Sequence, residues 1–519
     1  MTARTGAGRL LEAARGAGVE VCFANPGTTE MPLVLALDQV AGMRAVLGLF
    51  EGVCTGAADG WARMTGRPAA TLLHLGPGLA NGIANLHNAR RARTPVVNWI
   101  GEHATSHLAF DAPLTSDIEA LAGTVGWVRT VRSAAEMAEA SVAAVSAAMG
   151  PPGRVASLVI PADCQWSPAG AASAAGRPDV KNPAGPDAAA IGEAATLLRR
   201  GGGALLLGGP ALSEKGLRAA ARVAAATGAA VWVETFPSRQ ERGRHLPAFP
   251  TLPYFPEQAR AALESIQALV LAGSRDPVAF FKYPGQPSRF APEGAPVLML
   301  ADPDAGVDAA AALEELAEAL GAPPWSAPEA DALRYLPTGA ALTPENLGAA
   351  IAAYTPDGAI VVNEAATTGM VWNSAWAGKA APHTMLGLTG GSIGQGLPCA
   401  LGAAIACPDR KVIAFQADGS GLYTLQALWS MAREGTDMTV VVCANRRYRI
   451  LQYELSRVTA TPGPKAVGLT DIGHPDLSWV DLAKGFGVPG VAVKTDAELA
   501  TALERALADD GPKVIEAVL

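Results

Sequence analysis

Short apolar segments of strand length alternate with alanine-rich helical segments along almost the whole chain. The apolar runs end in turn residues and include residues 21–24, 204–207, 229–233, 268–272, 296–300, 359–363, 411–417 and 438–443. Strands that alternate with helices form parallel sheets, because each crossover helix returns the chain to the same edge. We therefore expect an α/β fold of doubly wound parallel sheets. At 519 residues the chain is too long for one hydrophobic core, so we expect about three domains.

Two breaks in the pattern predict where those domains meet. Residues 165–187 and 323–344 are rich in Ala, Gly, Pro or Ser and lack helical or strand periodicity. They predict domains at 1–165, 187–322 and 340–519. The central segment lacks the G-x-G-x-x-G spacing of a dinucleotide site after its first strand, and Pro210 stands where a phosphate would need an N–H donor. We interpret it as a structural domain.

The sequence Asp418-Gly419-Ser420 follows the apolar run 411–417, and Asn445 follows the next one, 438–443. We expect a helix over 422–432, whose N-terminus offers free N–H groups to phosphate oxygens. Neighbouring parallel strands end at the same edge, so Asp418 and Asn445 are expected to supply oxygen ligands to one Mg²⁺ ion. An ordinary strand–turn–helix junction with a capping Asp or Ser has the same sequence pattern and is the alternative interpretation.

A second acidic residue, Glu51, lies in the apolar run 47–54. Such a residue is either a first-turn helix residue at the surface or a buried functional acid. Ala57-Ala58-Asp59-Gly60-Trp61-Ala62-Arg63 and Leu72-Leu73-His74-Leu75-Gly76-Pro77-Gly78 follow it. Together with the Asp418 motif, these segments resemble the thiamine-diphosphate (ThDP) enzymes related to benzoylformate decarboxylase and the acetolactate synthase large subunits. The resemblance covers nearly the whole chain.

This resemblance implies a three-domain fold of the pyruvate decarboxylase type and a role for each candidate residue. Domain 1–165 would bind the pyrimidine half of ThDP and domain 340–519 its diphosphate. Glu51 would hydrogen-bond the aminopyrimidine N1′ and so favour the tautomer that deprotonates the thiazolium C2. Asp418, Asn445 and the backbone oxygen of Arg447 would hold Mg²⁺. The remaining implied cofactor contacts are Gly419, Ser420, Tyr448, Gly391, Ser392, Thr367 or Thr368, and Ile393, which could equally be an ordinary core isoleucine.

The chain departs from the family pattern at two places in these motifs. The usual Gly-Asp-Gly is Ala417-Asp418-Gly419, and the usual Asn-Asn is Ala444-Asn445. Both departures keep the implied metal ligands.

Residues near the expected substrate also follow the resemblance in part. His74 and Thr28 match an active-site histidine and serine of benzoylformate decarboxylase, although each could instead serve packing or helix capping. A second active-site histidine is replaced by Phe280, which cannot shuttle protons. We hypothesise that protonation of the enamine intermediate is slow here, so that a second carbonyl compound can be captured. Glu454 stands at an aromatic pocket position and either selects a polar or cationic substrate or is a solvent-exposed helix residue.

The resulting expectation is a ThDP- and Mg²⁺-dependent enzyme that decarboxylates a small 2-oxo acid, with carboligation as a further outcome. The alternative is an acetolactate synthase-type carboligase that joins two 2-oxo acids. The central segment has no motif that excludes the flavin of acetolactate synthases, although we doubt its presence. A non-catalytic relative and a coenzyme-A thioester lyase are less favoured.

Charge and hydropathy limit the partners. The net charge of −8, without a Lys/Arg block, argues against nucleic acid or an anionic membrane. No uninterrupted apolar run approaches the roughly 18 residues of a membrane span, and the N-terminus lacks a signal-peptide core. We expect a cytoplasmic protein. Because cofactor sites in the family form between chains, the resemblance implies a homodimer or homotetramer.

Overall fold

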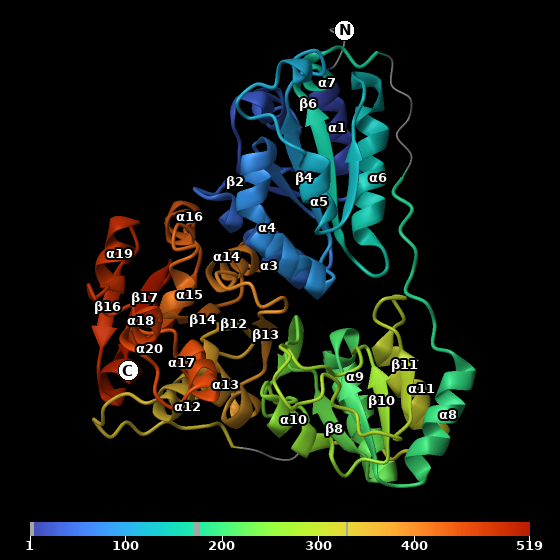
Figure 1. The fold of residues 1–519 in the computed structure, drawn as a ribbon, viewed down its shortest axis with the longest axis vertical. Helices are drawn as coiled ribbons and strands as arrows, with labels where there is room; N and C mark the ends of the chain where they lie inside the picture. The colour runs from blue at the N-terminus through green and yellow to red at the C-terminus, as the bar shows by residue number, and fades with distance from the viewer. Residues whose placement is uncertain (1–4, 171–176, 328–330) are drawn as a thin grey trace.

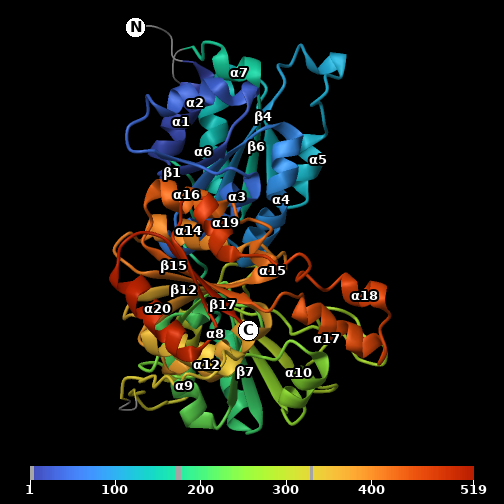
Figure 2. The same ribbon diagram turned by 90° about the vertical axis from the view of Figure 1, so that its left-hand side faces the viewer.

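Three sheets organise the chain in the computed structural model, which describes residues 5–170, 177–327 and 331–519. Helices cover both faces of each sheet, and the three layered units lie around a common centre (Figures 1 and 2). Among the named strands, every pairing is parallel except that of β13 with β9. The prediction of three doubly wound α/β sheets is therefore confirmed.

The first sheet has six strands in the order β2-β1-β3-β4-β6-β5. Its strands are β1 (Val21–Asn25), β2 (Arg44–Leu47), β3 (Ala69–Leu73), β4 (Val96–Glu102), β5 (Trp127–Thr130) and β6 (Val155–Pro161). The helices are α1 (Gly6–Gly16), η1 (Thr28–Glu30), α2 (Met31–Leu37), α3 (Glu51–Thr65), α4 (Leu75–Ala92), η2 (Leu108–Phe110), α5 (Ile118–Gly123), η3 (Ala134–Glu136), α6 (Met137–Met149) and α7 (Ala162–Trp166).

The central sheet has four strands in the order β11-β10-β7-β8. Its strands are β7 (Gly203–Leu207), β8 (Ala230–Val233), β10 (Ala268–Ala272) and β11 (Val297–Ala301). The helices are α8 (Ala188–Arg199), η4 (Gly209–Leu212), α9 (Glu214–Thr227), α10 (Pro256–Leu263) and α11 (Ala309–Ala319). All four strands lie where the apolar runs of the central segment predict them.

The third sheet has seven strands in the order β16-β17-β15-β14-β12-β13-β9. Its strands are β9 (Arg239–Arg242), β12 (Ala359–Glu364), β13 (His383–Gly387), β14 (Val412–Ala417), β15 (Met438–Ala444), β16 (Gly490–Val493) and β17 (Lys513–Val518). The helices are α12 (Pro344–Tyr354), α13 (Ala366–Ala375), η5 (Ala377–Lys379), α14 (Gly396–Ala406), α15 (Asp418–Gly421), α16 (Ala427–Glu434), α17 (Arg449–Val458), α18 (Pro464–Gly468), α19 (Trp479–Gly485) and α20 (Asp496–Ala508).

Two features of the third sheet differ from the sequence-based expectation. The expected helix over 422–432 is wrong in its bounds, because α15 begins at Asp418 itself and the longer α16 begins only at Ala427. The edge strand β9 comes from the central segment and pairs antiparallel with β13, which periodicity did not predict. Parts of both predicted breaks, residues 171–176 and 328–330, lie outside the described residues, and the domain boundaries stay a prediction.

One hydrophobic core joins the first and third sheets. Buried residues of α3, such as Val53 and Ala57, belong to the same cluster as Leu397 and Ala400 of α14 and Val440 of β15. Among the described residues, no helix combines the length and the apolar character that crossing a bilayer requires.

Candidate functional site

The order of the strands reverses at one point in each sheet, and candidate residues lie at these points. In the first sheet the chain leaves β1 toward β2 on one side and reaches β3 on the other; in the third it leaves β12 toward β13 on one side and reaches β14 on the other. Crevices at the carboxyl ends of such strands are the usual ligand sites of open α/β sheets. Thr28 and His74 follow β1 and β3, and Asp418 follows β14.

Asp418 and Asn445 converge as predicted, at the ends of the adjacent strands β14 and β15. Ala417 pairs with Cys443 across these strands, and the Asp418 carboxylate accepts the backbone N–H of Gly419 at 2.8 Å and of Arg446 at 2.6 Å. Burial raises the pKa of Asp418, and within the described residues it forms no ion pair. A buried carboxylate without an ion-pair partner, on a strand end next to the one that carries Asn445, supplies the kind of oxygen ligands that Mg²⁺ prefers.

The neighbours of this pair have different roles. The Asn445 side-chain oxygen accepts the Arg447 N–H at 3.0 Å, which fixes the turn after β15. A Cβ at Gly419 would lie 2.6 Å from the Tyr448 ring, so the ring rests on the Gly419 backbone. Ser420 is buried, and its hydroxyl accepts Gln416 Nε2 at 2.7 Å. The same hydroxyl donates to the Ala417 carbonyl at 3.2 Å, so the backbone N–H of Ser420 is the group left for a diphosphate.

The loop from Thr389 to Gln395 carries Gly391, Ser392 and Ile393, and Glu364 holds its end. The Glu364 carboxylate accepts backbone N–H groups of Gly394 at 2.7 Å, Gln395 at 3.3 Å and Gly396 at 2.6 Å, and so caps α14. Burial raises the pKa of Glu364. Thr367 and Thr368 lie in the first turn of the adjacent α13.

Helix α4, which belongs to the first sheet, also binds this loop through hydrogen bonds of two asparagine side chains. Asn88 donates to the Ser392 carbonyl at 2.7 Å and accepts the Ser392 N–H at 3.2 Å. Asn85 donates to the carbonyls of Gly52 at 2.8 Å and Gly394 at 3.4 Å. Because Gly52 follows Glu51, the Asn85 contacts place the start of α3 beside this loop.

The side chains of Glu51 and His74 both lie close to Gly78. A Cβ at Gly78 would lie 3.2 Å from Glu51 Oε1 and 3.4 Å from the Cβ of His74. Asn81 Nδ2 donates to the other Glu51 oxygen at 3.0 Å. Glu51 is half-buried at the first position of α3. The two residues predicted to be catalytic therefore lie close together, and the absence of a side chain at Gly78 leaves room for both.

A buried carboxylate, Glu30, holds His74. Glu30 is fully buried, and its Oε2 lies 2.8 Å from His74 Nδ1. Carboxylates accept, so Nδ1 carries the proton in this contact and Nε2 faces away. Two glycines make the arrangement possible: a Cβ at Gly27 would lie 2.3 Å from the His74 ring, and one at Gly101 would lie 1.6 Å from Glu30 Oε1. Thr28 is exposed at the start of η1.

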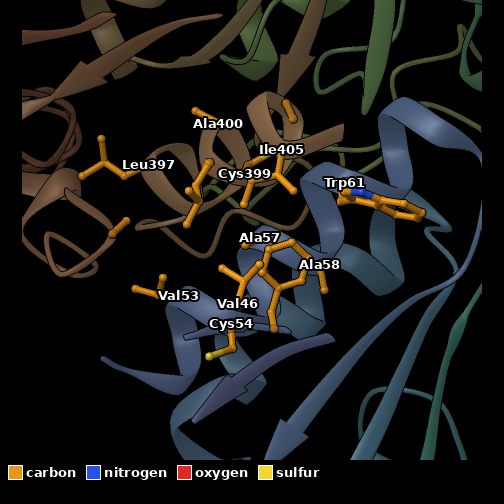
Figure 3. Packing of buried hydrophobic residues seen from close by; sticks show 14 of the residues in the cluster. Val46, Val53, Cys54, Ala57, Ala58, Trp61, Leu397, Cys399, Ala400 and Ile405 are labelled. Atoms are coloured by element: carbon orange, nitrogen blue, oxygen red, sulfur yellow. The ribbon is translucent and has the colours of Figure 1, made fainter. Parts of the chain in front are cut away.

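Helix α3 reaches this position because it packs unusually close to α14. A Cβ at Gly60 of α3 would lie 2.0 Å from the Cys399 carbonyl oxygen, and one at Gly402 of α14 would lie 1.9 Å from that of Ala57. Each helix therefore places a glycine against the backbone of the other. Figure 3 shows the buried side chains around this crossing, with Cys399 on α14 and Ala57 on α3.

Phe280 also reaches the loop. A Cβ at Gly391 would lie 2.5 Å from the Phe280 ring, so the ring covers that glycine. Phe236, Tyr254 and Phe281 surround it, with ring centroids 5.3, 5.8 and 4.9 Å away. These rings come from the central segment and form an aromatic wall beside the predicted cofactor loop.

Glu454 is neither freely solvated nor unpaired. Its Oε1 accepts the Tyr283 hydroxyl at 2.8 Å, and its Oε2 lies 3.5 Å from Arg457. Its side chain is 23% exposed. Arg457 lies closer to Glu257, at 2.6 Å, so one guanidinium is shared between two carboxylates, and selection of a polar or cationic substrate by Glu454 stays a prediction.

A cleft of about 1720 Å³ opens at the carboxyl ends of the central strands, where the strand order reverses between β7 and β10. Glu234, directly after β8, lines it, and burial raises the pKa of this carboxyl to about 7. Arg91 and Arg275 add positive charge, and Phe280 lines the end near Gly390. Residues of all three units, such as Arg91, Arg275 and Gly390, line this cleft, and no sequence motif indicated it.

Sequence reasoning missed Glu30 and Glu364, which hold the candidate residues in place. Glu364 ends the apolar strand β12, which is the signal that singled out Asp418, and Glu30 comes five residues after β1, at the end of η1. The signal was present for Glu364, but nothing in one sequence says which acid faces which loop.

Comparisons with known proteins agree with this geometry. Residues 4–122 match the family model of the "Thiamine pyrophosphate enzyme, N-terminal TPP binding domain", and residues 365–517 match that of the C-terminal TPP binding domain. The chain is 50% identical to the "Putative acetolactate synthase large subunit IlvX" of Mycobacterium tuberculosis over 99% of both chains. It is 32% identical to benzoylformate decarboxylase of Pseudomonas aeruginosa over 97% of both chains. A solved 4-hydroxybenzoylformate decarboxylase from Rhodococcus jostii superposes with a TM-score of 0.85 at 27% identity, covering 99% of both chains.

Proposed function

Because the chain belongs to the family of thiamine pyrophosphate enzymes, we propose that it decarboxylates a small 2-oxo acid with ThDP and Mg²⁺. The observation that carries the proposal is the convergence of Glu51 and His74 over Gly78, beside a loop that α4 and Glu364 hold in place. Family membership implies ThDP, and the residues present suit it.

Each group of residues then has a defined task. Asp418, Asn445 and the Arg447 backbone oxygen would hold Mg²⁺, and the N–H groups at the start of α15 and α13 would face the diphosphate. Glu51 would accept a hydrogen bond at the pyrimidine N1′ and so hold a proton there. His74, oriented by Glu30, would present Nε2 to the substrate. Bound ThDP would supply the electron sink that lets CO₂ leave.

The test is a CO₂-release screen of pyruvate and of branched, aromatic and basic 2-oxo acids, with and without ThDP and Mg²⁺. Glu51→Gln should lower the turnover by about 10²–10⁴-fold, the usual contribution of acid–base catalysis. Glu193→Gln, an exposed residue of α8, is the matched control and should leave turnover unchanged. The proposal fails if no acid releases CO₂ in a ThDP-dependent manner, or if Glu51→Gln turns over like the wild type.

A second candidate function is carboligation of the acetolactate synthase type. Two observations favour it: Phe280, which cannot transfer a proton, covers Gly391, and the central cleft extends from Phe280 to the carboxyl ends of β7 and β10. A slow final protonation would leave time for a second carbonyl compound to react. Acetolactate synthases carry a flavin in this region, so an absorbance spectrum of the purified protein tests that part directly.

Product analysis separates the two functions. A 2-oxo acid supplied together with an aldehyde should give a ligated hydroxyketone, and Phe280→His should shift the products toward free aldehyde. The matched control is Phe281→His, a neighbouring ring of the same wall. Free aldehyde as the only product of the wild type would exclude carboligation.

The proposal includes a homodimer or homotetramer, as the family resemblance implies. Sedimentation of the purified protein at several concentrations measures the assembly state, and a monomer at micromolar concentration would contradict it.

A further inference from the structure

Arg446 adopts a backbone conformation that is unusual for its residue type. It follows Asn445, and its φ of +59° lies in the left-handed region that favours glycine. A large side chain persists there only where surrounding contacts over-determine it. The turn that joins the two proposed metal ligands therefore needs an anchor.

The backbone of Arg446 supplies part of that anchor. Its N–H donates to Asp418 Oδ2 at 2.6 Å, and its carbonyl accepts the Ile472 N–H at 3.0 Å. The left-handed turn is what aims the N–H at Asp418. The orientation of the Asp418 carboxylate thus depends on the conformation of the next segment.

The side chain of Arg446 supplies the rest of the anchor for this turn. Arg446 Nη2 lies 2.6 Å from Glu516 Oε1, and the guanidinium also pairs with Asp476. The Glu516 side chain is only 3% exposed, on β17 opposite Val442 of β15. Its other oxygen accepts the Val480 N–H at 3.2 Å. The ion pair therefore ties the Arg446 turn to a rigid buried strand.

We infer that Arg446 and Glu516 are positioning residues for the Mg²⁺ ion that would bridge Asp418 and Asn445. The ion pair stabilises the left-handed turn at Arg446. This turn directs the Arg446 N–H at one oxygen of Asp418, and the remaining lone pairs of that carboxylate stay free to bind the metal. Partners that orient a metal ligand without touching the metal commonly change metal affinity by about 10–100-fold. The inference rests on the proposed function, because it concerns the same site.

The test is calorimetric titration of Mg²⁺ into protein that contains saturating ThDP. The double variant Arg446→Met with Glu516→Gln suits it, because it removes the ion pair, leaves neither buried charge unpaired, and keeps a side chain that disfavours the left-handed turn. We expect the Mg²⁺ affinity to fall by about 10–100-fold. Arg129→Gln with Glu139→Gln, which removes an ion pair of the first sheet, is the matched control and should not change it.

Urea unfolding without ligands separates positioning from a purely structural role. A structural role predicts a shifted unfolding midpoint with unchanged Mg²⁺ affinity, and that result would overturn the inference. If the wild type itself fails to bind ThDP and Mg²⁺, the proposed function falls. If the wild type binds both and the double variant binds Mg²⁺ equally well, only this inference falls.

Discussion

The close crossing of α3 and α14 predicts that a single methyl group at Gly60 will disturb the site. Its Cβ would lie 2.0 Å from the Cys399 carbonyl oxygen, whereas real Cβ contacts stay above about 3 Å, so the helices must separate by about 1 Å. The obstacle is backbone, which cannot rotate away. Gly60→Ala should therefore lower the free energy of unfolding by about 1–3 kcal/mol, the usual cost of overpacking.

The same displacement of α3 should also lower the catalytic rate. Glu51 is the first residue of α3, so a shift of the helix moves its carboxylate relative to the loop that Asn85 and Asn88 hold. A misplacement of about 1 Å can cost about 10²-fold in rate. We expect ThDP-dependent CO₂ release to fall by about that factor, well beyond what the lost stability explains.

A matched control isolates the contact. Gly192 lies inside α8, and a Cβ added there would meet no neighbouring atom within 4 Å. Gly192→Ala should therefore keep wild-type activity and gain up to about 1 kcal/mol from helix propensity. Urea unfolding and CO₂ release are measured on both variants. If Gly60→Ala unfolds and turns over like the wild type, the close helix contact does not position Glu51.

Three further predictions concern buried polar groups. Burial lowers the pKa of His383 to about 4, so below pH 6.5 the unfolded state binds more protons than the folded state. The free energy of unfolding should therefore fall by about 3 kcal/mol from pH 6.5 to 4, and urea titrations of His383→Gln should lose that slope. Glu30→Gln should lower turnover by at least about 10²-fold and change the ¹⁵N shifts of the His74 ring; unchanged shifts would contradict the role of Glu30. Asp418→Asn should weaken Mg²⁺ binding in calorimetry, and equal affinity would remove Asp418 from the metal site.

Much of the fold could be predicted because strand periodicity is local. The apolar runs of the central segment form β7, β8, β10 and β11 with bounds within a residue or two. The convergence of Asp418 and Asn445 also followed from local reasoning, since both end adjacent strands. The helix after Asp418 was misplaced because the short α15 and the turn after it interrupt the apolar periodicity, which alone does not reveal such a break.

Contacts between distant segments could not be predicted in the same way. Strand β9 joins the third sheet because its backbone pairs with β13, and its residues, Arg239 to Arg242, carry no apolar signal. The cleft could not be predicted because its walls come from all three units, whose residues lie far apart in the sequence.

The sequence by itself determined the alternation of strands and helices, the family, and the acids at strand ends, because hydrophobic periodicity and turn chemistry act over a few residues. Only the tertiary structure decided that Glu30 holds His74, that Glu364 caps α14, and that Gly60 lets α3 bring Glu51 to the loop. These outcomes depend on which surfaces meet, and close packing between segments hundreds of residues apart fixes them to within an ångström.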